Sequence, residues 1–267
     1  MRSPQLITVA LGILLIIVLY TIPRRTPERI TRYDEWLDTA MFSMPGDQLA
    51  SLEETLDQLK SEKDGNRRAD IYSDLAIRFD GEEWPQLHAE YLRLKAESTE
   101  PQTGELWAEA GDAFLATLEQ RSWEEGVVVD LGMHALYSYE RALDFDSTRI
   151  DWKLGLSQCY TDYQGNVMQG VFLLRDIAAE VPTHPEANLR LGRFALMSGQ
   201  IDRAKIRFAT ALEGDSLNLQ ARIMLAEVLA GTGDPEEARE ILEAGSRMFS
   251  DSSSLEQLRT AIDKFSQ

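Results

Sequence analysis

Cysteine is nearly absent from this chain of 267 residues, which contains one, Cys159. A single cysteine cannot form an intramolecular disulfide or a cysteine-based metal cluster. Histidine is scarce too: the three histidines lie far apart, and none has a second metal-ligating side chain at the spacing that zinc sites use. The sequence therefore predicts no disulfide framework and no metal centre.

Positive charge is also in short supply. The chain has 27 lysine and arginine residues against 45 aspartate and glutamate residues, a formal net charge of −18, and six of its basic residues are lysines. Nucleic-acid binding requires a basic face that neutralises phosphates, so this composition argues against a nucleic-acid-binding protein. An acidic, lysine-poor composition fits either a salty environment or an ordinary well-solvated surface.

The sequence shows no cluster of catalytic side chains. Cys159 lies among apolar residues in a helical pattern, which is typical of a buried cysteine. His184 lies in a Pro-Thr-His-Pro turn, and residues 144–151 lack the central glycine and the final glutamate of a calcium loop. We therefore expect no enzyme activity, no cofactor and no small-molecule substrate. His134 or His184 beside carboxylates in a closed pocket would reopen the enzyme hypothesis.

One uncharged run stands near the N-terminus. Residues 6–22 contain no charged side chain, and as a helix they would span roughly 25 Å, slightly less than the ~30 Å hydrocarbon core of a bilayer. Tyr20 suits a membrane interface, and Pro23 would end the helix. A cleaved signal peptide is the alternative, but the run lacks a small-residue cleavage site. We predict that residues 1–22 form an uncleaved, single-pass membrane anchor.

The charges around this anchor do not determine on which side of the membrane the rest of the chain lies. Residues 1–32 contain five arginines and one glutamate, so all of the net acidity belongs to the rest of the chain. Arginines after the anchor favour a cytoplasmic body, whereas a short basic N-terminus is also typical of exported, anchored proteins. We expect residues 23–46 to form a basic juxtamembrane linker and turn, on which the acidic body stands off anionic lipid.

Internal repetition is the strongest pattern in the remaining chain. Small and bulky apolar residues recur at an offset of 34 residues. This period is typical of a two-helix repeat, in which small residues let the helices approach and a bulky residue fills the next space. The matching pairs are Leu191 and Leu225, Gly192 and Ala226, Gly199 and Gly233, Ala204 and Ala238, and Phe208 and Leu242.

At these residues the chain resembles the tetratricopeptide repeat (TPR) family. The resemblance is closest over residues 185–252 and weaker over 151–184, where the first helix is about one residue out of register. It implies an all-α fold: a right-handed α-solenoid of TPR-like helix pairs preceded by the transmembrane helix. The body is expected to divide into degenerate helical repeats over 47–103, TPR-like repeats over 104–252 and a C-terminal capping helix over 253–267.

About twelve additional residues near 120–132 interrupt the repeat of residues 104–149. They include Trp123 and three consecutive valines. They either lengthen the helices and bury their own apolar side chains, or project as a contact loop or form a dimer surface.

The TPR resemblance also implies where a partner would bind. The inner face of such a solenoid is built mainly from the first helix of each pair. In TPR proteins that grip an acidic C-terminus, this face carries paired lysines and asparagines. Here its one basic member is Arg193, so we expect a hydrophobic or basic partner segment. The residues expected to line this concave groove are Asp112, Leu115, Leu154, Gln158, Thr161, Leu189, Arg193, Leu196, Met197, Ile223 and Glu227.

Similarity to N-terminally anchored bacterial TPR proteins implies a non-catalytic scaffold or adaptor that holds a protein partner near the cell membrane. The same analogy points to assembly or quality control of an envelope or respiratory complex. The alternative is a permanent structural subunit of a larger membrane complex. Detergent extraction separates the two, because a fixed subunit co-purifies stoichiometrically and an adaptor does not.

Overall fold

The computed structural model describes residues 33–264, apart from residues 82 and 121. These residues form helices and the turns between them, with no strand in the described part of the chain, so the predicted all-α class is confirmed there. The elements are α2 (Tyr33–Ser43), α3 (Gly46–Ser61), α4 (Gly65–Arg78), α5 (Pro85–Ser98), α6 (Gly104–Gln120), α7 (Glu125–Phe145), α8 (Ile150–Gln158), the π-helix η1 (Cys159–Tyr163), α9 (Val167–Glu180), α10 (Pro185–Met197), α11 (Ile201–Gly214), α12 (Leu219–Gly231), α13 (Pro235–Ser246) and α14 (Ser252–Lys264).

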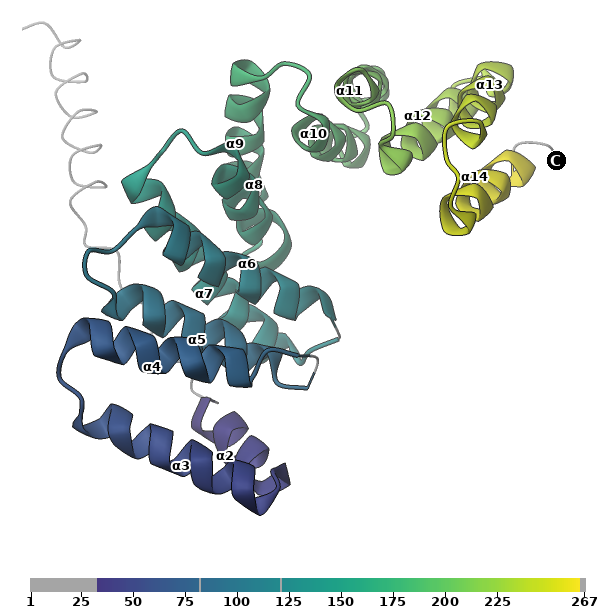
Figure 1. The fold of residues 1–267 in the computed structure, drawn as a ribbon. Coiled ribbons are helices and arrows are strands. Elements are labelled where there is room, and N and C mark those ends of the chain that lie inside the picture. Colours follow the sequence, from purple (N-terminus) through teal and green to yellow (C-terminus); the bar gives the residue numbers. More distant parts are fainter. Residues whose placement is uncertain (1–32, 82, 121, 265–267) are drawn as a thin grey trace, which may run out of the picture.

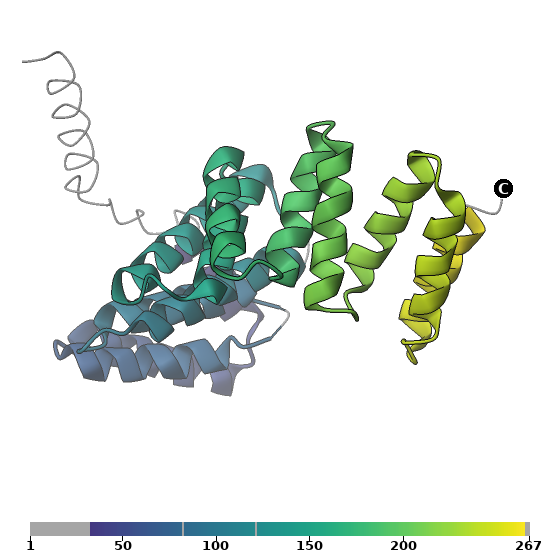
Figure 2. The ribbon, with the colours of Figure 1, turned by 90° about the horizontal axis from the view of Figure 1, so that it is seen from above.

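The helices form a series of pairs, each packed on the next. The pairs are α4–α5, α6–α7, α8–α9, α10–α11 and α12–α13, and α14 packs against α13 and α12. Helices α2 to α9 form a thick block, from which α10 to α14 extend as a narrower arm (Figure 1). Seen from above, the helices of this arm stand side by side in a row (Figure 2).

Local sequence explains where the repeated helices begin. Helix α10 starts with a proline at its first position, and the His184 side chain accepts a hydrogen bond from the backbone N–H of Ala187 at 3.3 Å. The turns inside the last two pairs contain Gly199 and Gly233, with φ of 70° and 98°. Only glycine adopts this left-handed region readily, which explains why glycine recurs there at the repeat offset.

The predicted anchor, residues 1–22, lies outside the described residues. Among the residues that are described, no helix is both long enough and apolar enough to cross a membrane.

The segment after the anchor differs from the prediction. We expected residues 23–46 to be a linker ending in a turn, but Tyr33–Ser43 is the helix α2. Its Tyr33 ring meets the ring of Tyr91 edge-on at a centroid distance of 5.7 Å, and Ala40 is fully buried. Helix α2 is therefore part of the packed body.

Among the described residues, the apolar core forms three clusters. The largest fills the block from α2 to η1, and a second lies between α10 and α14. A small cluster centred on Leu174 and Ile177 of α9 lies between them. In the second cluster, a Cβ added to Gly192 would lie 2.5 Å from the fully buried ring of Phe208, so the ring occupies the space that glycine leaves. The predicted pairing of small and bulky residues is present here.

A π-helical turn explains the register shift predicted for residues 151–184. In η1 the N–H of Gln164 donates to the carbonyl of Cys159 at 3.0 Å, a five-residue step in place of the usual four. Helix α8 begins 35 residues before α10, whereas α9 begins 34 residues before α11. The extra residue is thus contained within the first helix of this pair.

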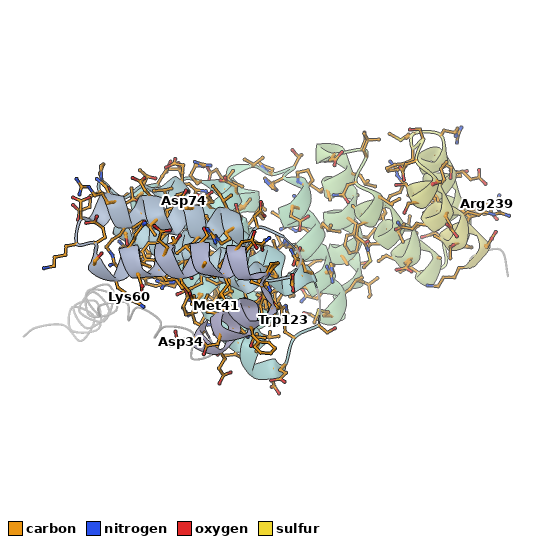
Figure 3. All side chains as sticks on the ribbon, turned by 60° about the horizontal axis from the view of Figure 1, so that its bottom comes forward. Asp34, Met41, Lys60, Asp74, Trp123 and Arg239 are labelled. Atoms are coloured by element: carbon orange, nitrogen blue, oxygen red, sulfur yellow. The ribbon has the colours of Figure 1, made fainter. Side chains whose placement is uncertain are left out.

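The twelve additional residues of the preceding pair lengthen its helices. Helices α6 and α7 have 17 and 21 residues, compared with 13 and 14 in α10 and α11. Trp123, labelled in Figure 3, packs on Trp36 of α2 at a ring-centroid distance of 6.4 Å. Val127 and Leu131 are buried. The insertion therefore buries apolar side chains and joins α2 to the repeats.

Candidate functional site

A pocket lies where the first helices of three successive pairs, α6, α8 and α10, present side chains to a common space. We call it the groove pocket; its volume is about 470 Å³. Its apolar residues are Val167, Phe194 and Met197, and its polar residues include three carboxylates and two arginines. The full set of lining residues is Glu119, Gln158, Thr161, Asp162, Val167, Glu186, Arg190, Arg193, Phe194 and Met197.

A chain of hydrogen bonds crosses the groove pocket from helix to helix. The side-chain amide of Gln158 on α8 donates to Glu119 on α6 at 2.9 Å. The amide oxygen of Gln158 accepts from Arg190 on α10 at 3.0 Å, and Arg190 also donates to Glu186 at 2.5 Å. These hydrogen bonds link the first helices of three consecutive repeats. The Glu186 carboxylate compensates the charge of Arg190 within the protein.

The remaining charges of the pocket are separated. Glu119 accepts a hydrogen bond from the neutral side-chain amide of Gln158, and Asp162 accepts one from the Thr161 hydroxyl at 2.6 Å. Neither carboxylate therefore forms an ion pair with a cation in the described part of the chain. Arg193 is exposed on α10, and no ion pair engages it among the described residues. Met197 beside it is 79% exposed. The pocket thus combines an acidic wall on α6 and η1 with an apolar rim on α10.

The structure brings only some of the predicted groove residues together. Gln158, Thr161, Arg193 and Met197 line the groove pocket. Leu154, Leu196 and Ile223 are half-buried and pack against the core clusters.

Two predicted groove residues belong to the core. Leu115 and Leu189 are 8% and 7% exposed and lie within the apolar clusters, so they are not surface residues of the groove. On a helix, neighbouring positions are turned by about 100°, so a small error in the projected face moves a residue from groove to core.

The two predicted acidic groove residues are already engaged. Asp112 accepts a hydrogen bond from the hydroxyl of Tyr139; burial raises the pKa of Asp112, and this hydrogen bond opposes the shift. Glu227 on α12 forms an ion pair with Lys264 of α14 at 2.9 Å. Helix α14 therefore supplies a cation to the C-terminal end of the first-helix face.

Six residues that line the groove pocket were not among the predicted groove residues: Glu119, Asp162, Val167, Glu186, Arg190 and Phe194. Glu119 lies one helical turn after Leu115, in the segment lengthened by the insertion, beyond the end of an ordinary repeat helix. Glu186 precedes Arg190 by four residues, a spacing that pairs opposite charges on a helix and that the sequence did show.

The residues considered for chemistry lie inside the protein or in turns. Cys159 is fully buried, and burial raises the pKa of its thiol, which makes the thiolate unfavourable. His184 caps α10. Within the described part of the chain, no three side chains of histidine, cysteine, aspartate or glutamate are grouped as a metal site would require.

His134 does lie beside a carboxylate, but in the core. Its Nδ1 is 3.7 Å from Oε2 of Glu90, and the two side chains are 2% and 0% exposed. Arg93 donates to both oxygens of Glu90 at 2.9 and 2.8 Å and to Glu97 at 3.0 Å. Burial alone would lower the pKa of Arg93, but its hydrogen bonds and charge interaction with Glu90 outweigh burial and raise it. Glu90, Arg93 and His134 thus form a buried network of charged and polar side chains in the core.

Comparison with known proteins agrees with the geometry. Residues 207–262 match the sequence profile of a family described as tetratricopeptide repeat. The sequence has no significant match among curated proteins.

Solved structures share the fold at low sequence identity. PilW, described as a widely conserved type IV pilus biogenesis factor, is 18% identical with a TM-score of 0.52, covering 86% of this chain and 99% of that chain. MamA from Desulfovibrio magneticus RS-1, from residue 41 to its end, is 16% identical with a TM-score of 0.51, covering 71% and 95%. Another MamA structure is 14% identical with a TM-score of 0.50, covering 67% and 90%.

These solved structures show that the fold is shared. The sequence match identifies tetratricopeptide repeat sequence at residues 207–262, and the succession of helix pairs over the described residues is that of a tetratricopeptide repeat fold.

Proposed function

We propose that this chain is a membrane-anchored TPR scaffold that holds a hydrophobic or basic segment of a protein partner in the groove pocket. TPR proteins bind protein partners, which supports the general role. The observation that carries the proposal is the groove pocket itself: it exposes Met197 next to the carboxylates of Glu119 and Asp162, which have no cation in the described residues. An apolar side chain of the partner would cover Met197, and a lysine or arginine would approach the carboxylates.

Site-specific crosslinking tests this binding mode. A photoreactive residue at Met197 of the full chain in native membranes is expected to crosslink a defined partner band. The same probe at Ile77, which is 70% exposed on α4, is the matched control and should not. The double change Glu119→Lys and Asp162→Lys should weaken binding of the identified partner by about tenfold or more, since it reverses the acidic wall. Equal crosslinking at both sites, or unchanged affinity in the double variant, would contradict the proposal.

Membrane anchoring is supported by the uncharged run at residues 6–22, which has nearly the length that a bilayer requires. The full chain is expected to stay in the membrane pellet after alkaline carbonate extraction, and a chain lacking residues 1–32 is expected to be released. Protease treatment of spheroplasts then identifies the side on which the acidic body lies. Release of the full chain by carbonate would count against the anchor.

The role in assembly or quality control of an envelope or respiratory complex rests on analogy with anchored TPR proteins. The competing function is a fixed structural subunit of such a complex. An adaptor is lost or substoichiometric after detergent extraction, whereas a fixed subunit keeps a constant ratio to its neighbours.

A further inference from the structure

A second pocket adjoins the groove pocket at the edge of the repeats. It lies between the start of α9, the end of α10 and the start of α11, with a volume of about 490 Å³. We call it the edge pocket. It shares Val167, Phe194 and Met197 with the groove pocket, so the two form adjoining parts of one surface.

The edge pocket differs from the groove pocket in charge. Arg175, Arg203 and Arg207 line it, and none of its lining residues is acidic. In a chain with 45 acidic and 27 basic residues, three arginines without a carboxylate in one pocket are a local reversal of charge. The rest of the wall is mainly apolar and includes Met168, which is 58% exposed.

The three arginines are not neutralised within the described part of the chain. Arg203 donates to the amide oxygen of Gln200 at 2.5 Å, and Arg207 donates to that of Asn188 at 2.8 Å. Arg175 has no hydrogen bond or ion pair with any described residue. Amide oxygens satisfy guanidinium hydrogen bonds but leave the positive charge uncompensated, so the pocket favours an anionic group.

Arg207 has an additional structural role. Asn188 is fully buried and donates to the carbonyl groups of Pro182 and His184, so the bond from Arg207 helps to hold the turn between α9 and α10. Arg175 and Arg203 are exposed and make no comparable contact, which leaves them available to a ligand.

We propose that the edge pocket binds a carboxylate-bearing, apolar segment of a partner protein, with an aspartate, a glutamate or a C-terminal carboxylate at Arg175 and Arg203 and a large apolar side chain against Met168 and Phe194. The arginines complement the charge of a carboxylate, and the apolar wall fits a large apolar side chain, so the pocket favours a peptide that carries both. The proposal extends the proposed function to a second contact, but its charged residues, Arg175 and Arg203, are not those of the groove pocket. A segment that crosses Met197 would place its basic part in the groove pocket and its acidic part in the edge pocket.

The test uses the full chain in detergent micelles and a phage-displayed library of random dodecapeptides as the probe. Peptides selected on the wild-type chain, with counter-selection on the Arg175→Glu/Arg203→Glu variant, are expected to combine a carboxylate with an aromatic or large aliphatic residue. Synthetic copies should bind this edge variant at least about tenfold more weakly than the wild type. They should bind the Arg247→Glu/Arg259→Glu variant, which makes the same charge change on exposed residues elsewhere, within about twofold of the wild type.

Circular dichroism melting curves establish that each variant is folded. The Glu119→Lys/Asp162→Lys variant separates the two proposals: if the groove proposal fails and the edge proposal holds, selected peptides lose affinity only in the edge variant. Selection of peptides without carboxylates, failure to select any peptide, or equal affinity for the edge variant would overturn the edge proposal. Binding of soluble dihexanoyl phosphatidylglycerol that the edge variant abolishes, without peptide binding, would assign the pocket to lipid and overturn it as well.

Discussion

Replacing Arg93 by methionine is expected to lower the free energy of unfolding by about 3–5 kcal/mol. Arg93 is 5% exposed and donates to both oxygens of Glu90, whose side chain is fully buried. The substitution removes the cation and leaves the Glu90 carboxylate in the core without its main partner. An unpaired buried charge lowers the stability far more than the loss of a surface charge does. Urea denaturation of the full chain in mild detergent, followed by far-ultraviolet circular dichroism, measures the change.

The chain contains a matched control for this experiment. Arg239 pairs with Glu236 and Glu243, the same spacings at which Arg93 pairs with Glu90 and Glu97, but it is 49% exposed. Figure 3 shows Arg239 projecting outward at the far end of the molecule from α3 and α4. Arg239→Met is expected to cost no more than about 1 kcal/mol. Equal losses in both variants would show that burial does not govern the Arg93 network.

A second variant separates the buried charge from the packing of Arg93. If the loss arises from the unpaired carboxylate, then Glu90→Leu combined with Arg93→Met should recover much of the stability, since it leaves no buried charge from this pair. A double variant as unstable as Arg93→Met alone would assign the loss to packing.

Phe208→Ala is expected to destabilise the protein by about 3–5 kcal/mol, because it removes a fully buried ring and leaves a cavity between α10 and α11. The ring lies against Gly192, which has no side chain that could fill the space. The same denaturation experiment measures this change, and the C-terminal arm is where structure should be lost first, since its core cluster is separate from that of the block.

Ile206 provides the control on the same helix. It is 63% exposed, so Ile206→Ala removes apolar atoms without opening a cavity, and the expected change is within about 0.5 kcal/mol. A loss for Phe208→Ala as small as that for Ile206→Ala would mean that the small and bulky residues of the repeat do not hold the helices together.

The repeated core was predictable from sequence because its signal is periodic. The match of Gly192 with Ala226 and of Phe208 with Leu242 needed only a constant offset, and the structure places Gly192 and Phe208 in contact. Helix α2 was not predictable in this way, since it belongs to no repeat and buries only Tyr33 and Ala40. A single helix whose pattern does not recur at the repeat offset is difficult to distinguish from a linker by sequence.

The groove pocket was only partly predictable. Gln158, Arg193 and Met197 follow from the first-helix pattern, but the pocket also needs Glu119 and Asp162, which lie where this chain departs from the repeat. Glu119 belongs to the lengthened end of α6, and Asp162 lies in the π-helix. A pattern derived from regular repeats places residues least reliably where helices have gained length.

The π-helix η1 also bears on how such a chain tolerates changes in length. One codon inserted into an α-helix would turn every later side chain by about 100° and present the wrong face to the neighbouring helices. Here the wider turn confines the extra residue to Cys159–Tyr163, and α9, α10 and α11 resume the spacing of the later repeats. A gene encoding stacked helices can therefore accept a single-codon insertion inside a helix, and it need not confine such insertions to loops.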